Sequence, residues 1–313
     1  MSRVPSSLSS RLLCPLPLLV IVGPTASGKS ALALRLAEYF QAEIVACDAL
    51  QVRAGLPLLT AKPTQDELSR IPHHLIGAFP ADEPATAARY AESADRAIAD
   101  ILSRGRRVIL CGGTGLYLRA LCEGLVATPP ADPDLRARLR KEAEEHGLPT
   151  LHARLSAIDP ESAARIAPAD YVRIERALEV YEQSGRTLTD WHREHQAERA
   201  QGPRYQTIRI GLDPGPERLR ERISVRTKDW LAQGLCQEVA DFAAVAGPMR
   251  FPPLGYEQTL RYLAGALDAE SLQIEICQKT AQYARRQRIW FRSEPDITWF
   301  AMAQEVNPQQ IAM

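Results

Sequence analysis

Short apolar runs alternate with amphipathic stretches along the first 125 residues of the chain. Each apolar run ends at a glycine or an acid, as is typical of strands that are buried on both faces of a sheet. These runs span residues 17–23, 42–48 and 106–113. The stretches with helical spacing span residues 27–40, 86–105 and 116–125. Strands that alternate with helices predict an α/β fold with a parallel sheet and right-handed crossovers.

The pattern changes in the middle of the chain. From about residue 130 to residue 200 the sequence is charged, helix-like and poor in strand patterns. An alternating apolar run at 205–213 then predicts a further strand of the core. Long helical patterns follow at 216–234 and 272–292. The simplest organisation is an α/β core that is interrupted by a helical insertion.

Domain boundaries follow from this change of pattern. Residues 16–129 and 201–313 are predicted to form the core domain, and residues 130–200 the insertion domain. Residues 1–15 are predicted to be a flexible N-terminal tail. The apolar run at 12–22 superficially resembles a signal peptide. Because it leads directly into a glycine loop, its removal would delete a core strand, so we favour the strand.

Composition narrows the class of protein. The chain has 313 residues, of which 45% are hydrophobic and 24% charged, as in ordinary soluble domains. The 38 basic residues balance the 38 acidic ones, so any nucleic-acid contact must come from a local basic surface. The six cysteines form no C-x-x-C pair, which favours a reducing, cytoplasmic location. We expect no membrane span and a monomer, since no apolar run is long enough and nothing requires an oligomer.

The strongest chemical signal is a G-x-x-x-x-G-K-[ST] loop between the first predicted strand and the first predicted helix. Backbone N–H groups of such a loop converge on phosphate oxygens at the positive end of the helix. Lys29 adds a positive charge, and the hydroxyl of Ser30 can bind Mg²⁺ or a phosphate oxygen. The loop consists of Gly23, Pro24, Thr25, Ala26, Ser27, Gly28, Lys29 and Ser30. It predicts a site for a chain of phosphates.

Two further strand ends should border the same site. Asp48 ends the second predicted strand, and Thr114 follows the third within a glycine-rich turn. Asp48 suits a general base or a metal ligand, although it could equally be a turn acid. The turn at Thr114 could also lack any ligand. Cys111 stands where many ATP-hydrolysing loop proteins have an aspartate for Mg²⁺, which weakens an ATPase interpretation.

Basic residues form two other candidate features. Arg222 and Arg226 are spaced to lie on one helix face, where they could reach a diphosphate or pair with surface acids such as Glu221 and Asp229. The stretch 279–292 carries five basic residues and no acid, interleaved with aromatics. It suits either RNA binding or a core helix with solvated arginines. We expect His73 and His74 to close a loop.

Taken in order, these motifs resemble those of the tRNA dimethylallyltransferases, also called tRNA isopentenyltransferases or IPP transferases. The similarity extends from about residue 19 to residue 292. The similar motifs are GPTASGKS at 23–30, CDALQ at 47–51, TAKPT at 60–64, PHHLI at 72–76, GGTGLYLRAL at 112–121, RALEVYEQSGR at 176–186, GY at 255–256 and QYARRQRIWFR at 282–292. The family usually has other residues at Ala49, Arg53, Pro252, Pro253, Ala281 and Ile289.

This resemblance implies a P-loop NTPase-like core and a reaction. A dimethylallyl group passes from dimethylallyl diphosphate to the exocyclic amine of the adenosine 3′ of the anticodon, and diphosphate leaves. The family uses Mg²⁺ as its cofactor and no nucleoside triphosphate. The target base is flipped into a channel, as base-modifying enzymes commonly require. The insertion domain grips the anticodon stem-loop of the tRNA.

The resemblance also assigns roles to residues. Asp48 matches the general base, Thr114 matches a threonine near the reacting centre, and Arg226 matches an arginine on the diphosphate. The phosphate loop matches the diphosphate cradle, with Ser30 at the metal. The residues that match tRNA contacts are Asp48, Ala49, Leu50, Gln51, Thr114, Arg136, Val172, Arg173, Ile174, Glu175, Arg176, Gly255 and Tyr256.

Two other functions remain open at this point. In a small-molecule P-loop kinase, Asp48 would deprotonate a substrate hydroxyl. In a tRNA-binding protein with weakened catalysis, the departures from the family pattern would have cost the activity.

Overall fold

The computed structural model describes residues 16–200, 202–247, 249 and 251–311, so the predicted tail at 1–15 lies outside the described residues. The chain separates into two compact units. The first, here called the core unit, includes the described residues up to Glu123 and those from Arg204 onward. The second, the insertion unit, spans 124–203 and includes the predicted insertion at 130–200.

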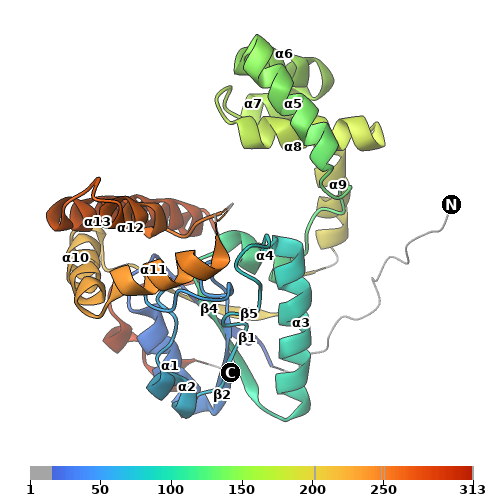
Figure 1. Cartoon of the computed structure of the whole chain (residues 1–313). Helices are drawn as coiled ribbons and strands as arrows, with labels where there is room; N and C mark the ends of the chain where they lie inside the picture. The colour runs from blue at the N-terminus through green and yellow to red at the C-terminus, as the bar shows by residue number, and fades with distance from the viewer. Residues whose placement is uncertain (1–15, 201, 248, 250, 312–313) are drawn as a thin grey trace. The chain divides into compact units, whose positions relative to one another are not determined.

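A six-stranded parallel sheet forms the centre of the core unit (Figure 1). The strand order is β3-β2-β4-β1-β5-β6, and every pair of neighbours runs parallel. The strands are β1 (Leu18–Val22), β2 (Ala42–Ala46), β3 (His73–His74), β4 (Arg107–Gly112), β5 (Thr207–Leu212) and β6 (Ile297–Phe300). The predicted α/β fold with a parallel sheet is therefore confirmed.

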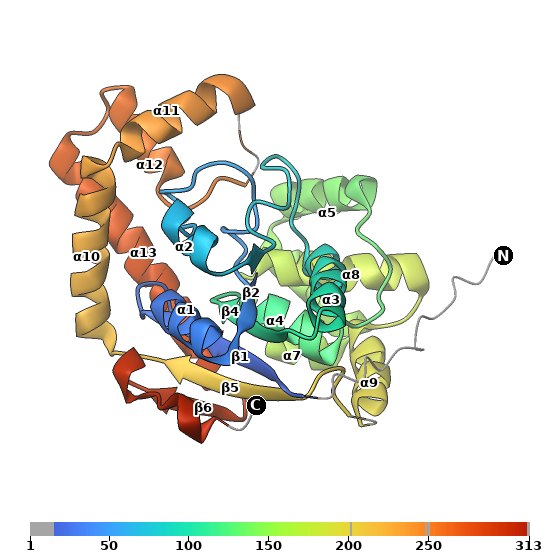
Figure 2. The same ribbon diagram turned by 90° about the horizontal axis from the view of Figure 1, so that it is seen from below.

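Helices cover both faces of this sheet. Those of the core unit are α1 (Lys29–Phe40), α2 (Gln65–Arg70), α3 (Ala87–Ser103), α4 (Gly115–Glu123), α10 (Pro216–Ala232), α11 (Leu235–Ala246), α12 (Tyr256–Leu263) and α13 (Ala269–Arg292), with 3-10 turns at Ala303–Glu305 and Pro308–Gln310. Figure 2 shows α1 on one side of the sheet and α3 and α4 on the other. Alternate side chains of each strand supply the two cores. Val20 packs on the side of α3 and α4, whereas Ile21 packs on the side of α1.

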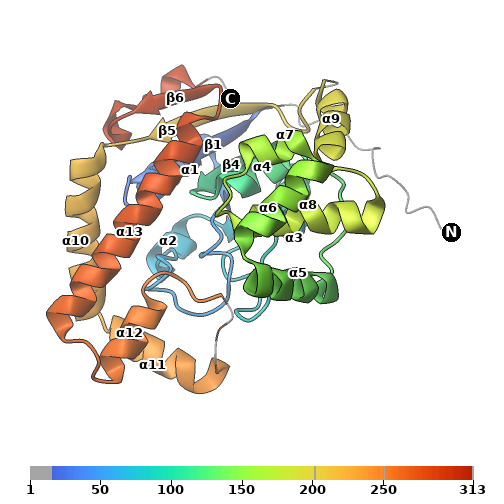
Figure 3. The ribbon, with the colours of Figure 1, turned by 90° about the horizontal axis from the view of Figure 1, so that it is seen from above.

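Within its described residues the insertion unit consists of five helices, all labelled in Figure 3. They are α5 (Pro133–His146), α6 (Leu148–Ile158), α7 (Pro160–Arg165), α8 (Tyr171–Ser184) and α9 (Leu188–Arg199). Leu139, Leu151, Leu155, Ile174 and Leu178 form the centre of its apolar core. The unit thus has a hydrophobic core of its own, as an independently folding domain requires.

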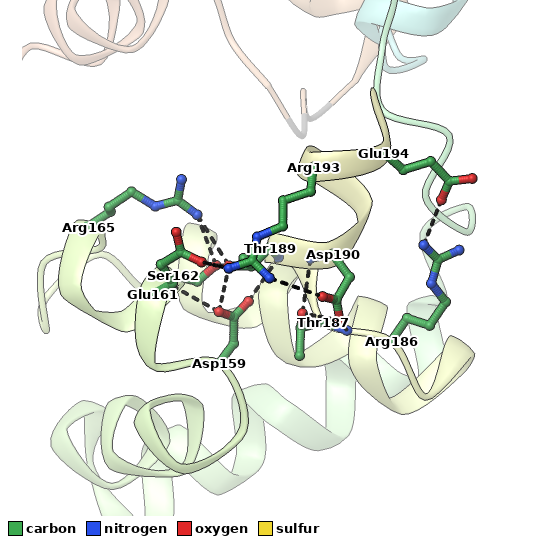
Figure 4. Close-up of polar contacts among 10 residues, drawn as sticks. All are labelled: Asp159, Glu161, Ser162, Arg165, Arg186, Thr187, Thr189, Asp190, Arg193 and Glu194. Atoms are coloured by element: carbon green, nitrogen blue, oxygen red, sulfur yellow. Dashed lines mark hydrogen bonds and ion pairs between the residues drawn. The ribbon is translucent and has the colours of Figure 1, made fainter. Parts of the chain in front are cut away.

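One buried carboxylate fastens two helices of the insertion unit (Figure 4). Asp159 caps the N-terminus of α7 by accepting the N–H of Ser162 at 3.0 Å. It also accepts the N–H of Thr189 at 3.0 Å and the Thr189 hydroxyl at 2.6 Å, at the start of α9. Burial alone would raise the pKa of Asp159, but the hydrogen bonds from Thr189 and Ser162 outweigh it and lower that pKa.

Some local expectations need correction. His73 and His74 do not close a loop but form the edge strand β3, paired with β2. His74 Nε2 lies 2.7 Å from Oε2 of the buried Glu43, which Arg104 also binds. No helix among the described residues is long and apolar enough to cross a membrane.

Candidate active site

The phosphate loop connects β1 to α1 at the carboxyl edge of the sheet. Gly28 caps α1, and among the described residues no side chain caps this helix end and no acid stands in its first turn. Its N–H groups are therefore available to an anion. Gly23 has a φ of 151°, and a Cβ there would lie 2.4 Å from the carbonyl oxygen of Leu212. The first glycine of the motif is thus required by the neighbouring strand β5.

Three basic side chains reach this loop. Lys29 Nζ donates to the carbonyl of Pro24 at 3.2 Å. From α10, Arg222 donates to the carbonyl of Ser27 at 2.9 Å, and Arg226 donates to the hydroxyl of Thr25 at 3.0 Å. Both arginines therefore point to the phosphate loop, and within the described part of the chain neither is paired with Glu221 or Asp229.

Burial makes the charges of two of these side chains, Lys29 and Arg226, costly without a bound anion. It lowers the pKa of Lys29, and the nearby Asp48 opposes this shift. It likewise lowers the pKa of Arg226 to about 10. The guanidinium of Arg226 packs over the ring of Trp230 at 4.5 Å, and its buried Nε has no hydrogen-bond partner among the described residues. An anion in the loop would be stabilised by both charges.

Asp48 follows β2 and faces the same cavity as the phosphate loop. Its Oδ1 accepts the N–H groups of Leu50 at 2.9 Å and Gln51 at 3.4 Å. The turn role considered for this acid is therefore present. It coexists with a place in the cavity wall, since Asp48 is only partly buried.

Thr114 holds the loop that carries Asp48. Its hydroxyl accepts the N–H of Ala49 at 2.9 Å, and its own N–H donates to the carbonyl of Cys47 at 3.1 Å. These bonds fix the residues on both sides of Asp48. The structure thus brings the loop, Asp48 and Thr114 to one edge of the sheet, as the strand ends predict.

A cavity of about 220 Å³ joins the phosphate loop to Asp48, whereas Thr114 does not line it. One end is polar and is lined by the loop residues Thr25, Ala26, Gly28, Lys29 and Ser30, together with Asp48 and Arg226. The apolar part of the wall consists of Leu50, Leu59, Trp230, Leu254 and Ile276. A cationic end beside an apolar wall fits a small molecule with a phosphate head and a hydrocarbon tail.

Helix α13 supplies wall residues that sequence analysis missed or interpreted differently. Ile276, Thr280 and Tyr283 line the cavity. Tyr283 is one of the aromatic residues in the stretch 279–292, for which the sequence allows stacking on RNA bases. Burial raises the pKa of the Tyr283 phenol. The spacing of these residues is that of one helix face, a signal that could have identified them. In the same helix Phe291 is buried and Arg285 is exposed, as the core-helix alternative expects.

The predicted tRNA residues of the insertion unit differ in how they are placed. Arg136 and Arg176 both bind the fully buried Glu179, with Arg136 Nε at 2.8 Å from Oε1 and Arg176 Nη1 at 2.5 Å from Oε2. Arg173 pairs with Asp170 and is largely exposed. Buried acids therefore hold Arg136 and Arg176 in place, and the two arginine side chains are only partly exposed.

Several other residues in the predicted tRNA set are buried. Ile174 lies in the core of the insertion unit, and Glu175 is buried, whereas Val172 is 71% exposed. Gly255 is the N-cap of α12, and the ring of Tyr256 is buried in an apolar cluster. The contacts of all these residues with tRNA stay predictions.

The described residues offer few side-chain ligands for the predicted Mg²⁺. In the described ranges, no three His, Cys, Asp or Glu side chains are grouped so that they could hold a metal ion. Ser30 has an exposed side chain and lines the cavity. The residues fit a Mg²⁺ ion that is bound mainly by phosphate oxygens and reached by the Ser30 hydroxyl.

A family model described as IPP transferase matches residues 51–294 of this chain, which is more than half of its length. The chain belongs to the IPP transferase family. The family resemblance predicted from the motifs is therefore confirmed.

Several curated relatives in the IPP transferase family are named tRNA dimethylallyltransferase. The relative from Geobacter metallireducens is 44% identical over 285 residues, which cover 90% of this chain and 91% of the relative. The relative from Anaeromyxobacter sp. (strain Fw109-5) is 46% identical over 286 residues, covering 91% of this chain and 94% of the relative.

Solved structures of related transferases share the fold. The tRNA isopentenylpyrophosphate transferase from Bacillus halodurans is 32% identical, with a TM-score of 0.63 over 91% of this chain and 89% of that one. A eukaryotic dimethylallyltransferase, described as acting on tRNA, is 27% identical, with a TM-score of 0.76 over 91% of this chain and 74% of that one.

Proposed function

We propose that this IPP transferase is a tRNA dimethylallyltransferase. It transfers a dimethylallyl group from dimethylallyl diphosphate to the exocyclic amine of the adenosine 3′ of the anticodon in tRNA, and it releases diphosphate. The observation that carries the proposal is the single cavity in which the cationic phosphate loop, an apolar wall and Asp48 meet. The names of the relatives support the same reaction.

The cationic end of the cavity suits the departure of diphosphate. The C–O bond of the substrate breaks, and its electron pair leaves with the diphosphate. Loop N–H groups, Lys29 and Arg226 are already directed at this charge, so little reorganisation is needed as it develops. Leu59, Trp230 and Ile276 would contact the hydrocarbon and exclude water from the reacting carbon.

Asp48 is proposed as the general base. The adenine nitrogen forms the new C–N bond, and the proton it loses passes to the carboxylate of Asp48. Because the amine lone pair is delocalised into the ring, accepting that proton favours attack. Thr114 holds the backbone at Cys47 and Ala49, and so keeps Asp48 at the sheet edge.

The proposal also covers Mg²⁺, the tRNA contacts, the oligomeric state and the cellular location. Ser30 and the diphosphate oxygens would hold Mg²⁺, whose charge would help to neutralise the leaving group. Arg136, Arg173 and Arg176 of the insertion unit are proposed to contact the anticodon stem-loop through its phosphates. We propose that the protein acts as a monomer in the cytoplasm.

Incubation with unmodified tRNA and labelled dimethylallyl diphosphate, in the absence of ATP, tests this function. We expect the label to appear on the tRNA. Tight tRNA binding without label would support the alternative of a binding protein with weakened catalysis. Phosphorylation of a small molecule by ATP, without prenyl transfer, would favour the kinase.

A further inference from the structure

Gln287 lies on the face of α13 that is turned toward the phosphate loop. Its side chain is 5% exposed and bonds two segments that are far apart in sequence. Its Oε1 accepts the N–H of Thr25 at 2.8 Å, and its Nε2 donates to the carbonyl of Gly113 at 2.9 Å. An amide is needed here, since one partner is a donor and the other an acceptor. Gln287 therefore ties the phosphate loop to the turn after β4.

The second of these bonds continues toward Asp48. Thr114 directly follows Gly113, and its hydrogen bonds to Cys47 and Ala49 hold the two neighbours of Asp48. Hydrogen bonds therefore connect the phosphate loop through Gln287 to Gly113. The next residue in the chain, Thr114, is hydrogen-bonded in turn to the residues beside the proposed base.

The turn after β4 also leaves space for this amide. A Cβ at Gly113 would lie 2.1 Å from Nε2 of Gln287, so any larger residue would displace the glutamine. The glycine at this position is therefore explained by the close approach of Gln287 rather than by a ligand.

We propose that Gln287 is a positioning residue for the transfer reaction. It does not line the cavity, but it sets the distance and orientation between the diphosphate cradle and Asp48. The inference rests on the proposed function, because only a reaction that uses the diphosphate cradle and Asp48 together needs them at a fixed distance and orientation. Small errors in that geometry reduce rates strongly.

Three variants separate this role from others. Gln287→Glu keeps the size but places a carboxylate oxygen against the carbonyl of Gly113. Gln287→Met removes both hydrogen bonds and adds no charge. The matched control is Gln278→Glu, which makes the same chemical change at an exposed position of α13 outside the stretch 279–292. Each variant is compared with the wild type for prenyl transfer, for diphosphate binding by calorimetry and for thermal unfolding.

We expect kcat/KM to fall by roughly 100-fold in Gln287→Glu, as for a misplaced reacting pair. In Gln287→Met we expect diphosphate to bind about tenfold more weakly, the effect of losing one hydrogen bond that orders the loop. Since methionine adds no charge, that loss cannot come from repulsion. Gln278→Glu should match the wild type in both measurements.

A merely structural role predicts a different result. It would lower kcat through loss of folded enzyme, while the KM for dimethylallyl diphosphate and the diphosphate affinity stayed unchanged. That outcome, or wild-type behaviour of Gln287→Met, overturns the inference. Absence of transfer by the wild type would instead contradict the proposed function, and the calorimetric comparison would still decide whether Gln287 orders the loop.

Discussion

Asp48 shows how one side chain can serve both the backbone and a reaction. One carboxylate oxygen accepts two backbone N–H groups and so shapes the turn after β2, while the carboxyl group lines the cavity. A substitution that removes the whole carboxyl group therefore disturbs two properties at once. A test of the base role must keep the turn.

Asp48→Asn meets this requirement, because asparagine can still accept both N–H groups through its amide oxygen. We expect the rate of prenyl transfer to fall by about 10²- to 10⁴-fold, as when a general base is lost. Binding of tRNA and of diphosphate should be kept, as measured by filter binding and calorimetry. Near-normal single-turnover rates in this variant would exclude Asp48 as the base.

Arg226 offers a test of the diphosphate site. Removing its guanidinium in Arg226→Ala should raise the KM for dimethylallyl diphosphate by about tenfold or more, the effect of losing a charge-assisted hydrogen bond. Arg220→Ala, at an exposed position of the same helix, is the control and should leave KM unchanged. Equal KM values in the two variants would remove Arg226 from the site.

The lowered pKa of Lys29 predicts a pH dependence. The ammonium group of Lys29 is charged well below its lowered pKa. It loses its proton and its charge as the pH rises through that pKa, at a lower pH than an exposed lysine does. Diphosphate affinity should therefore weaken at alkaline pH. In Lys29→Arg, where the charge at this position persists, the part of the decline that Lys29 causes should disappear. The ionisation of diphosphate and of Arg226, whose pKa is lowered to about 10, affects both proteins alike, so parallel curves would contradict the prediction.

At the scale of elements, the insertion unit depends on a few buried polar groups. Asp159 fastens α7 to α9, and we expect Asp159→Ala to destabilise this unit by about 1–3 kcal/mol, because buried donors lose their partner. Glu161→Ala is the control, since its ion pair with Arg193 is exposed and contributes less than about 1 kcal/mol. Limited proteolysis under mild urea, read for cleavage within 124–203, measures both. Equal protection of the two variants would contradict this.

The same carboxylate predicts an effect of acid. The pKa of Asp159 is lowered in the folded protein, so its stabilisation is present above the pKa of the unfolded chain, about 3.9, and is lost as the pH falls through the folded value. The difference in stability between wild type and Asp159→Ala should therefore shrink below about pH 4, as followed by urea unfolding. A difference that stayed constant well below pH 4 would contradict this prediction.

Long periodic elements were predictable from sequence, and short ones were not. The strands β1, β2 and β4 carry apolar runs, β5 carries an alternating pattern, and helices α1, α3 and α13 carry clear helical spacing. The two-residue β3 and the partly exposed β6 give no such pattern. Motif spacing placed Asp48 and Thr114 at the same sheet edge as the loop. The two bonds of Gln287 join residues 262 and 174 positions apart and leave no local signal.

For the whole molecule, the division into two units has a direct test. The N–H of Arg204 donates to the carbonyl of Cys122 at 2.9 Å, so the chain leaves and re-enters the core unit at adjacent points. Replacing residues 124–203 by a short glycine-serine linker should therefore leave the core folded.

We expect this shortened protein to bind diphosphate like the full chain and to lose most of its affinity for tRNA. Calorimetry and filter binding measure the two properties. Circular dichroism checks that the sheet is intact. Undiminished tRNA affinity would show that the insertion unit is not the main tRNA contact.

The position of β5 has a consequence for how the protein is made. Strand β1 lies between β4 and β5, yet residues 207–212 are synthesised long after residues 18–22, when the whole insertion unit has already been synthesised. Until then one edge of β1 has no partner strand, and Gly23 of the loop lacks its contact with Leu212 of β5. The emerging chain therefore carries an open sheet edge, the kind of surface that chaperones protect, for most of its translation.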